Sequence, residues 1–153
     1  MIETLTIDHA RYIAHHMRQN DHREVMATLW SDDPEDFAND AVHYPGASYA
    51  IIKNGEPVVM GGFAIHTPRV ATMWMVGTDR FDEVRIEATR TAKKVIGELL
   101  NGHTHRLQAL SAGFHDDSHE WLKRLGFNQI QPVPAMGKHG EDFLMFSQTR
   151  GKG

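Results

Sequence analysis

Cysteine is absent from the 153-residue sequence, and so are long apolar runs and basic clusters. Without cysteine the chain can form neither a disulfide nor a thiolate zinc site, and a reducing cytoplasm is the location we expect. No stretch reaches the roughly 18 consecutive apolar residues of a membrane-spanning helix, so we expect no membrane partner. Because 20 acidic residues outnumber 16 basic ones and no basic run exceeds two residues, we expect no nucleic-acid partner.

The composition fits a single folded domain over residues 1–153. Apolar residues make up 41% of the chain and charged residues 24%, which is enough apolar material for one core at this length. The sequence contains no internal repeat, no low-complexity segment and no linker. It therefore predicts one domain with its own hydrophobic core.

Residues 70–100 contain the pattern around which the rest of the chain is organised. In VATMWMV (70–76) both alternating faces are largely apolar, which is typical of a central strand buried on both sides. After the turn GTDRFDE, a long helix is expected over residues 82–100, with Arg90 and Lys94 facing water. Its apolar stripe is formed by Val84, Ala88, Ala92, Val95 and Leu99.

A hairpin is the strongest local signal. Asn54-Gly55 lies between two apolar runs, and this dipeptide favours a type I′ turn. With the strand over 70–76, the two runs predict a three-stranded antiparallel meander from Ser48 to Val76. Gly61-Gly62 inside the middle strand predicts a bulge or a close approach of another backbone.

The remaining patterns complete the order of elements. A short first strand and three helices are expected before the hairpin, with the second helix over residues 23–30. After the long helix, a strand over 106–112 should pair in parallel with the strand over 70–76, because a helix crossover joins them. A helix over 115–125, ended by Gly126, and strands over 127–130 and 143–146 follow.

This order of elements resembles the GNAT superfamily of N-acyltransferases over nearly the whole chain. The most specific segment is HDDSHEWLKRLGF at residues 115–127, which is similar to the closing helix of that fold and its terminal Leu-Gly-Phe. The resemblance implies an α/β protein with a mixed, mostly antiparallel sheet flanked by helices. It also implies that residues 70–76 form the central strand.

Within GNAT-like proteins, residues 121–127, 55–57 and 61–62 resemble a small group carried by short-tailed bacteriophages. That group includes internal virion (core) proteins and others labelled as acetyltransferases. The resemblance implies a phage-encoded protein in the host cytoplasm or associated with the virion, with a phage or host protein as its partner. It leaves the oligomeric state open.

The resemblance also implies acetyl-CoA as the cofactor. Its implied contacts lie at the end of the central strand and in the following turn: Met75, Val76, Gly77, Thr78 and Arg80. GNAT enzymes cradle the pyrophosphate there with the backbone of an Arg/Gln-x-x-Gly-x-Gly/Ala loop. In this chain Asp82 and Glu83 replace the small residues, and carboxylates repel a pyrophosphate. We therefore expect acetyl-CoA to bind weakly.

The acid of the family is also missing. Many GNAT enzymes use a tyrosine of the closing helix to protonate the departing thiolate, and Leu122 occupies that place here. The central strand carries no Asp or Glu that could act as a base on the amine. The candidate catalytic replacements are His115, Ser118 and Ser111, since a histidine can transfer a proton near neutral pH.

A metal site is not expected. His115 and His119 are four residues apart and share a helix face, with Asp116 or Glu120 near them. Zinc needs at least three protein ligands, and the sequence contains no HExxH or other remote ligand pair. We therefore interpret these histidines as surface or capping residues rather than metal ligands.

Two functions from different classes remain. One is an acetyl-CoA-dependent N-acyltransferase, with the reacting carbonyl in the V-shaped gap between the strands over 70–76 and 106–112. The other is a non-catalytic GNAT fold used in phage assembly or as a binding module. The altered turn and the missing acid favour weak or lost catalysis, since fold alone does not settle function.

Overall fold

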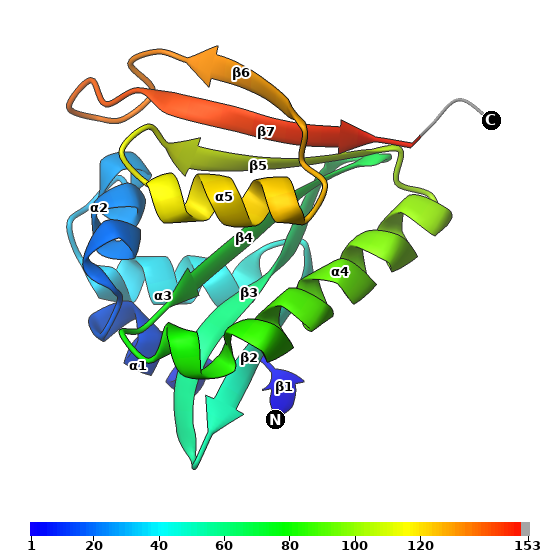
Figure 1. Ribbon diagram of the computed structural model, residues 1–153. Coiled ribbons are helices and arrows are strands. Elements are labelled where there is room, and N and C mark those ends of the chain that lie inside the picture. The colour runs from blue at the N-terminus through cyan, green and yellow to red at the C-terminus, as the bar shows by residue number, and fades with distance from the viewer. Residues whose placement is uncertain (151–153) are drawn as a thin grey trace.

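A computed structural model describes residues 1–150, which fold around one seven-stranded sheet (Figure 1). Its strand order is β1-β2-β3-β4-β5-β7-β6, and only β4 and β5 run parallel. The strands are β1 Ile2–Thr4, β2 Gly46–Lys53, β3 Glu56–Thr67, β4 Val70–Gly77, β5 Arg106–Ala112, β6 Gln129–Val133 and β7 Phe143–Thr149. The predicted α/β fold class and the central position of β4 are confirmed.

Helices cover both faces of this sheet (Figure 1). Within the described residues the α-helices are α1 Ile7–His15, α2 Gln19–Thr28, α3 Pro34–His43, α4 Arg85–Asn101 and α5 Asp116–Arg124. α1 and α3 pack on one face, where their buried residues share a cluster with Met60 of β3 and Val76 of β4. α4 and α5 pack on the other face, around Ala71 of β4 and Leu107 of β5. Both faces of β4 are therefore covered, as the sequence predicted.

The hairpin forms at the predicted dipeptide. Asn54 and Gly55 have φ angles of 52° and 80°, the positive values that a type I′ turn requires at both positions. Gly62 is a close-approach position, because a Cβ atom there would lie 2.0 Å from the Ala47 carbonyl oxygen of β2. The register shifts lie elsewhere, beside Ile51 of β2 and Ile65 of β3. Of the two alternatives for the glycine pair, close approach is correct.

β4 and β5 pair in parallel, as expected, but over a short distance. The ladder joins Val70 with Arg106, Ala71 with Leu107, and Thr72 with Gln108. The two strands continue to Gly77 and Ala112 without further pairing to each other. The sheet therefore opens between the carboxyl ends of its central parallel strands, the place where open α/β sheets bind ligands.

The start of the long helix differs from the prediction. α4 begins at Arg85 rather than residue 82, and a 3₁₀ turn, η1 (Phe81–Val84), precedes it. The turn is tight because the Phe81 N–H donates to the Thr78 carbonyl and the Glu83 N–H donates to the Arg80 carbonyl, both three residues back. Phe81 itself is buried in a cluster with strands β2 and β3, which holds the turn against the sheet.

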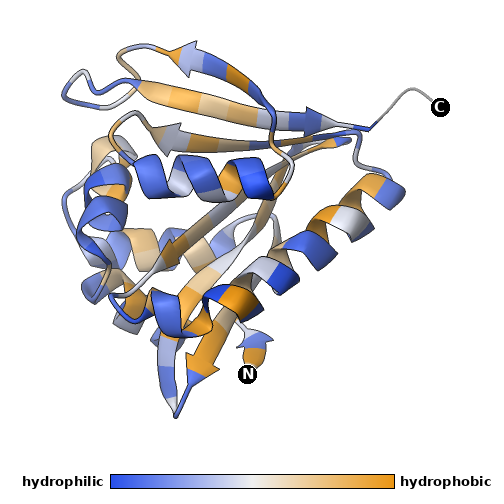
Figure 2. Ribbon diagram, in the orientation of Figure 1, coloured by the Kyte–Doolittle hydropathy of each residue, from blue (hydrophilic) through white to orange (hydrophobic). Residues whose placement is uncertain are grey.

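The buried stripe of α4 also differs in its last turns. Val84, Ala88 and Ala92 are buried as predicted, but Ile96 follows them, whereas Val95 and Leu99 are only half-buried. Arg90 and Lys94 are exposed, as predicted. Figure 2 shows apolar and polar residues alternating along the helix. The spacing of four continues to Ile96 because this side chain packs into the cluster that α5, β5 and β7 share.

We expect Ile96→Ala to lower the free energy of unfolding by about 2 to 3 kcal/mol, since it removes a buried branched side chain and leaves a cavity. Val95→Ala should cost less than about 1 kcal/mol, because Val95 keeps contact with solvent. Urea unfolding of the two variants measures both values. Equal losses would show that the helix presents a different face to the sheet.

Candidate active site

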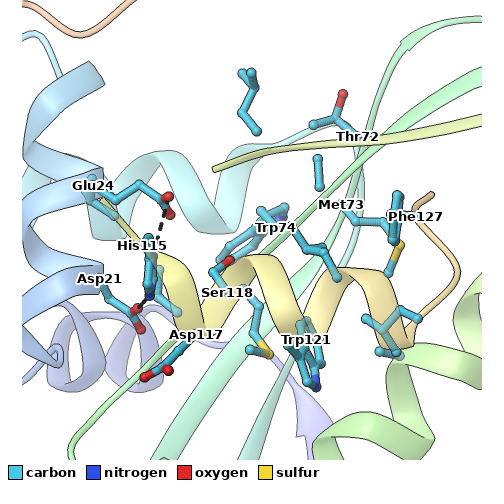
Figure 3. A pocket seen from close by; sticks show the side chains of 18 of the residues that line it. Asp21, Glu24, Thr72, Met73, Trp74, His115, Asp117, Ser118, Trp121 and Phe127 are labelled. Carbon is cyan, nitrogen blue, oxygen red and sulfur yellow. Dashed lines mark ion pairs between the residues drawn. The ribbon is translucent and has the colours of Figure 1, made fainter. Parts of the chain in front are cut away.

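A cavity of about 400 Å³ lies in the opening between β4 and β5 (Figure 3). Met73 and Met75 line it from the face of β4 that packs on α4 and α5. Trp74 and Val76 line it from the opposite face of the same strand, and Leu110 contributes from β5. The cavity therefore connects the two faces of the sheet. Its volume is within the range of small-molecule sites.

Helix α2 joins the two sides of this opening. Asp21 Oδ2 accepts the Gly77 N–H at the end of β4 at 2.7 Å, and Glu24 Oε1 accepts the Ala112 N–H at the end of β5. Asp21 and Glu24 are three residues apart, so they share one side of the helix. At the ends of β4 and β5 the two strands no longer pair with each other. Carboxylates from one helix thus accept the backbone N–H groups there.

Asp21 is a buried carboxylate with only 2% of its surface exposed. Burial raises the pKa of Asp21, and the Arg18 guanidinium and the Gly77 N–H partly oppose this rise. Arg18 Nη2 donates to both carboxylate oxygens, at 2.9 and 3.1 Å, and Nε donates to Oδ2. These contacts fix the orientation of the carboxylate at the edge of the cavity.

His115 lies between the two carboxylates of α2 (Figure 3). Its Nε2 is 3.3 Å from Asp21 Oδ1, and its Nδ1 is 3.5 Å from Glu24 Oε1. The side chain is buried, it lines the cavity, and Nδ1 makes no hydrogen bond within residues 1–150. When the proton is on Nε2 it faces Asp21, and Nδ1 then presents a lone pair.

This arrangement can accept a proton inside a partly enclosed cavity. A carboxylate that faces one imidazole nitrogen favours the tautomer in which the other nitrogen is a base. Asp21 supplies that carboxylate, and Nδ1 of His115, which faces Glu24, is the nitrogen that makes no hydrogen bond among residues 1–150. The geometry therefore suits general acid–base chemistry on a small molecule.

The structure brings two of the three predicted catalytic residues to the cavity. His115 and Ser118 line it from the start of α5. Ser111 is fully buried on β5 and is not part of the cavity lining, although its Oγ has no hydrogen-bond partner among the described residues. Leu122, at the place of the family's tyrosine, also lines the cavity. The catalytic roles of these residues remain predictions.

The predicted cofactor contacts divide into two groups. Met75 and Val76 line the cavity, whereas Gly77, Thr78 and Arg80 use their backbone N–H groups within the protein. The Gly77 N–H donates to Asp21 Oδ2. The Thr78 N–H donates to the Val58 carbonyl at 2.9 Å, and the Arg80 N–H donates to Thr78 Oγ1 at 3.3 Å. These three donors do not point freely toward a ligand.

The charges of the turn are also paired with each other. The Arg80 guanidinium contacts Glu83 and Glu56, each at 2.8 Å, and Arg85 pairs with Asp82. Hydrogen bonds from Arg80 lower the pKa of Glu83, and those from Arg85 lower the pKa of Asp82. Both carboxylates are therefore ionised at neutral pH, and Arg80 and Arg85 are already engaged.

Sequence reasoning missed Asp21 and Glu24. The predicted second helix began at residue 23, whereas α2 runs from Gln19 to Thr28 and contains both acids. Their spacing of three and the apolar Val25 beside them indicate an acidic pair near a buried face. That signal was present, but a helix start four residues late excluded Asp21 from the pattern.

No three His, Asp or Glu side chains within residues 1–150 converge as a metal site. His119, one of the two histidines four residues apart, directs Nε2 to the Ala112 carbonyl oxygen at 2.8 Å. His115 and His119 therefore contact different groups.

Within residues 1–150, none of the helices has the length and apolar character needed to cross a membrane.

Comparisons with known proteins relate the chain to acetyltransferases by structure. No protein-family model and no curated protein sequence matches it. The ribosomal-protein-S18-alanine N-acetyltransferase from Escherichia coli superposes with a TM-score of 0.71 and 16% identity, covering 100% of this chain and 95% of that one. The ribosomal-protein-alanine N-acetyltransferase from Brucella melitensis gives 0.72 and 14%, covering 97% and 99%. A GNAT-family acetyltransferase from Bacillus anthracis gives 0.74 and 11%, covering 99% and 95%. The chain therefore has the GNAT acetyltransferase fold.

Proposed function

We propose that this chain is an acetyl-CoA-dependent N-acyltransferase that binds its cofactor weakly. The observation that carries the proposal is His115, a buried histidine that lies between Asp21 and Glu24 and lines a cavity in the opening between β4 and β5. The GNAT fold of the structural neighbours supports the reaction class. Phage origin is part of the proposal and rests on the sequence resemblance alone.

The thioester end of the cofactor fits the site. The cavity offers the apolar side chains Met73, Met75 and Leu110 around the opening, and His115 is the polar group beside them. Acetyl-CoA, when bound, supplies the acetyl group as a thioester. Transfer forms a C–N bond and breaks a C–S bond, while the amine loses one proton and the thiolate gains one.

His115 is the group that moves this proton. Its imidazole accepts the proton from the acceptor amine, and the imidazolium formed is stabilised by Asp21 and Glu24 on either side. The same ring can return the proton to the departing thiolate. The Arg18 contact and the Gly77 N–H keep Asp21 in place, so the imidazole is held in one orientation.

The pyrophosphate end fits poorly, and this supports weak cofactor binding. Binding a pyrophosphate in the turn requires free N–H groups, but those of Gly77 and Thr78 already have acceptors. Arg80 is paired with Glu83 and Glu56. We expect a Kd for acetyl-CoA near 1 mM by calorimetry, or about -4 kcal/mol. Absence of both binding and acetyl transfer to amines would reject the proposal.

We expect the double variant Asp82→Asn, Glu83→Gln to bind acetyl-CoA roughly tenfold more tightly, because it removes two negative charges, releases Arg85 for the phosphates and leaves Arg80 paired with Glu56 alone. Calorimetry measures the change. The matched control is Glu98→Gln, which removes an exposed carboxylate from the distant end of α4 and should leave the Kd within about twofold. Micromolar binding by the unmodified protein would show that the phosphates are held elsewhere.

The second candidate is a non-catalytic protein of phage assembly or host interaction, in the virion or the host cytoplasm. Trp30, in the connection between α2 and α3, is fully exposed and favours this candidate. Exposed tryptophans are enriched among residues that carry protein–protein binding. If acetyl-CoA neither binds nor reacts and Trp30→Ala removes a partner, the second candidate replaces the first.

A further inference from the structure

The contact between His115 and Glu24 lacks a proton donor when a neutral His115 carries its proton on Nε2. With a proton on Nε2 toward Asp21, the Nδ1 lone pair faces the Glu24 carboxylate at 3.5 Å. Both groups are then hydrogen-bond acceptors, and an N–H donor in the cavity can bind the Glu24 carboxylate, which lines it. Within residues 1–150, neither lysine nor arginine lies within 4.0 Å of the Glu24 carboxylate. A cationic ligand fits this position.

Aromatic side chains line the same cavity on the face of the sheet that α3 covers. The Trp74 ring lies 6.3 Å from the Phe37 ring and 5.5 Å from the Tyr44 ring, in both cases edge to face. All three residues line the cavity together with Val25 of α2. Aromatic walls next to a carboxylate are typical of sites for cations with an apolar body.

Two side chains that line this part of the cavity carry a polar atom without a partner. His115 is only 5% exposed, and its Nδ1 faces Glu24 without a hydrogen bond among the described residues. The Nε1 atom of Trp74 is also buried without a hydrogen-bond partner among those residues. Buried polar atoms in native proteins normally have partners, so the polar groups around this part of the cavity are not fully satisfied by the chain itself.

We propose that this part of the cavity binds a small primary amine on an apolar or aromatic carbon skeleton, with the amino group at the Glu24 carboxylate and the skeleton against Trp74. The inference rests on the proposed N-acyltransferase function and names its acceptor. A total volume of about 400 Å³ suits a small molecule, since it is near the lower limit of ligand sites. The amine is thereby placed at Glu24, the carboxylate that His115 contacts.

The first test uses the unmodified protein without acetyl-CoA. 2-Phenylethylamine has the amine and the ring, 2-phenylethanol lacks the charge, and ethanolamine lacks the ring. We expect calorimetry or ligand-observed NMR at pH 7 to show 2-phenylethylamine binding at least about tenfold more tightly than either analogue. Equal binding of the three compounds, or none, would overturn the inference.

The second test locates the amine with matched variants. Glu24→Gln keeps an oxygen for the Ala112 N–H and removes the charge, so it should weaken 2-phenylethylamine binding at least about tenfold. Asp116→Asn removes an exposed carboxylate from α5 and should change the Kd less than about twofold. Unchanged binding in Glu24→Gln, at an unchanged melting temperature, would also overturn the inference.

Amine binding and acetyl transfer, measured separately, distinguish the amine site from the proposed acyltransferase activity on which it rests. Charge- and ring-dependent binding without acetyl transfer would support the amine site and reject the acyltransferase. Acetylation of ethanolamine as efficient as that of 2-phenylethylamine would support the acyltransferase and overturn the acceptor class. Because binding is measured without the cofactor, weak acetyl-CoA affinity does not affect the result.

Discussion

His115→Gln is expected to lower the rate of acetyl transfer about 100- to 10,000-fold, which is the range that a general acid–base contributes. Glutamine fills a similar volume and can donate to Asp21, but it cannot take up a proton. The Kd for acetyl-CoA should stay within about twofold, because His115 does not contact the turn over residues 77–83 in the described structure. Steady-state rates together with calorimetric Kd values measure the two effects separately.

The matched control is His119→Gln on the same helix. His119 directs Nε2 to the Ala112 carbonyl oxygen, and a glutamine amide can replace that donor. We expect the control to retain activity within about threefold. A rate that is unchanged in His115→Gln but lost in Ser118→Ala would contradict the assignment and make Ser118 the proton carrier.

Much of the fold could be predicted because its signals are local. The Asn54-Gly55 turn depends on two residues with positive φ, and the apolar runs on either side determine the meander. The parallel pairing of β4 with β5 follows from the crossover helix between them. The position of Ile96 was not predicted, because 95 and 96 are adjacent on the helix and tertiary packing decides which of them is buried.

The candidate site could be predicted only in part. His115 and Ser118 follow from the short segment that closes the fold, and that segment has its own helical pattern. Asp21 and Glu24 reach their backbone partners across 56 and 88 residues of chain, and no local pattern specifies such contacts. Likewise, the sequence shows that small residues are missing from the turn, whereas only the structure shows that its N–H groups have partners.

Asp21→Ala is expected to lower the free energy of unfolding by about 3 to 5 kcal/mol, as the loss of one member of a buried charged network does. The change leaves the Gly77 N–H, the Arg18 guanidinium and Nε2 of His115 without their acceptor. The melting temperature should fall by roughly 10 °C. Asp21→Asn keeps an oxygen for the Gly77 N–H and should cost only about 1 to 2 kcal/mol at neutral pH.

The difference in free energy of unfolding between the unmodified protein and Asp21→Asn should depend on pH, and this dependence gives a sharper test. Burial places the pKa of Asp21 above its ordinary value of 3.8, so the native protein keeps this proton at pH values where the unfolded chain has released it. The contribution of Asp21 to stability is therefore complete below the unfolded pKa and is lost as the pH rises through the native pKa. Asparagine does not titrate, so the stability advantage of the unmodified protein over Asp21→Asn should shrink as the pH rises from 4 to 7. Urea unfolding of both proteins across this range measures it. An advantage that grows with pH would mean that attraction to Arg18 outweighs the cost of burying the carboxylate, and it would reverse the direction of the pKa shift assigned to Asp21.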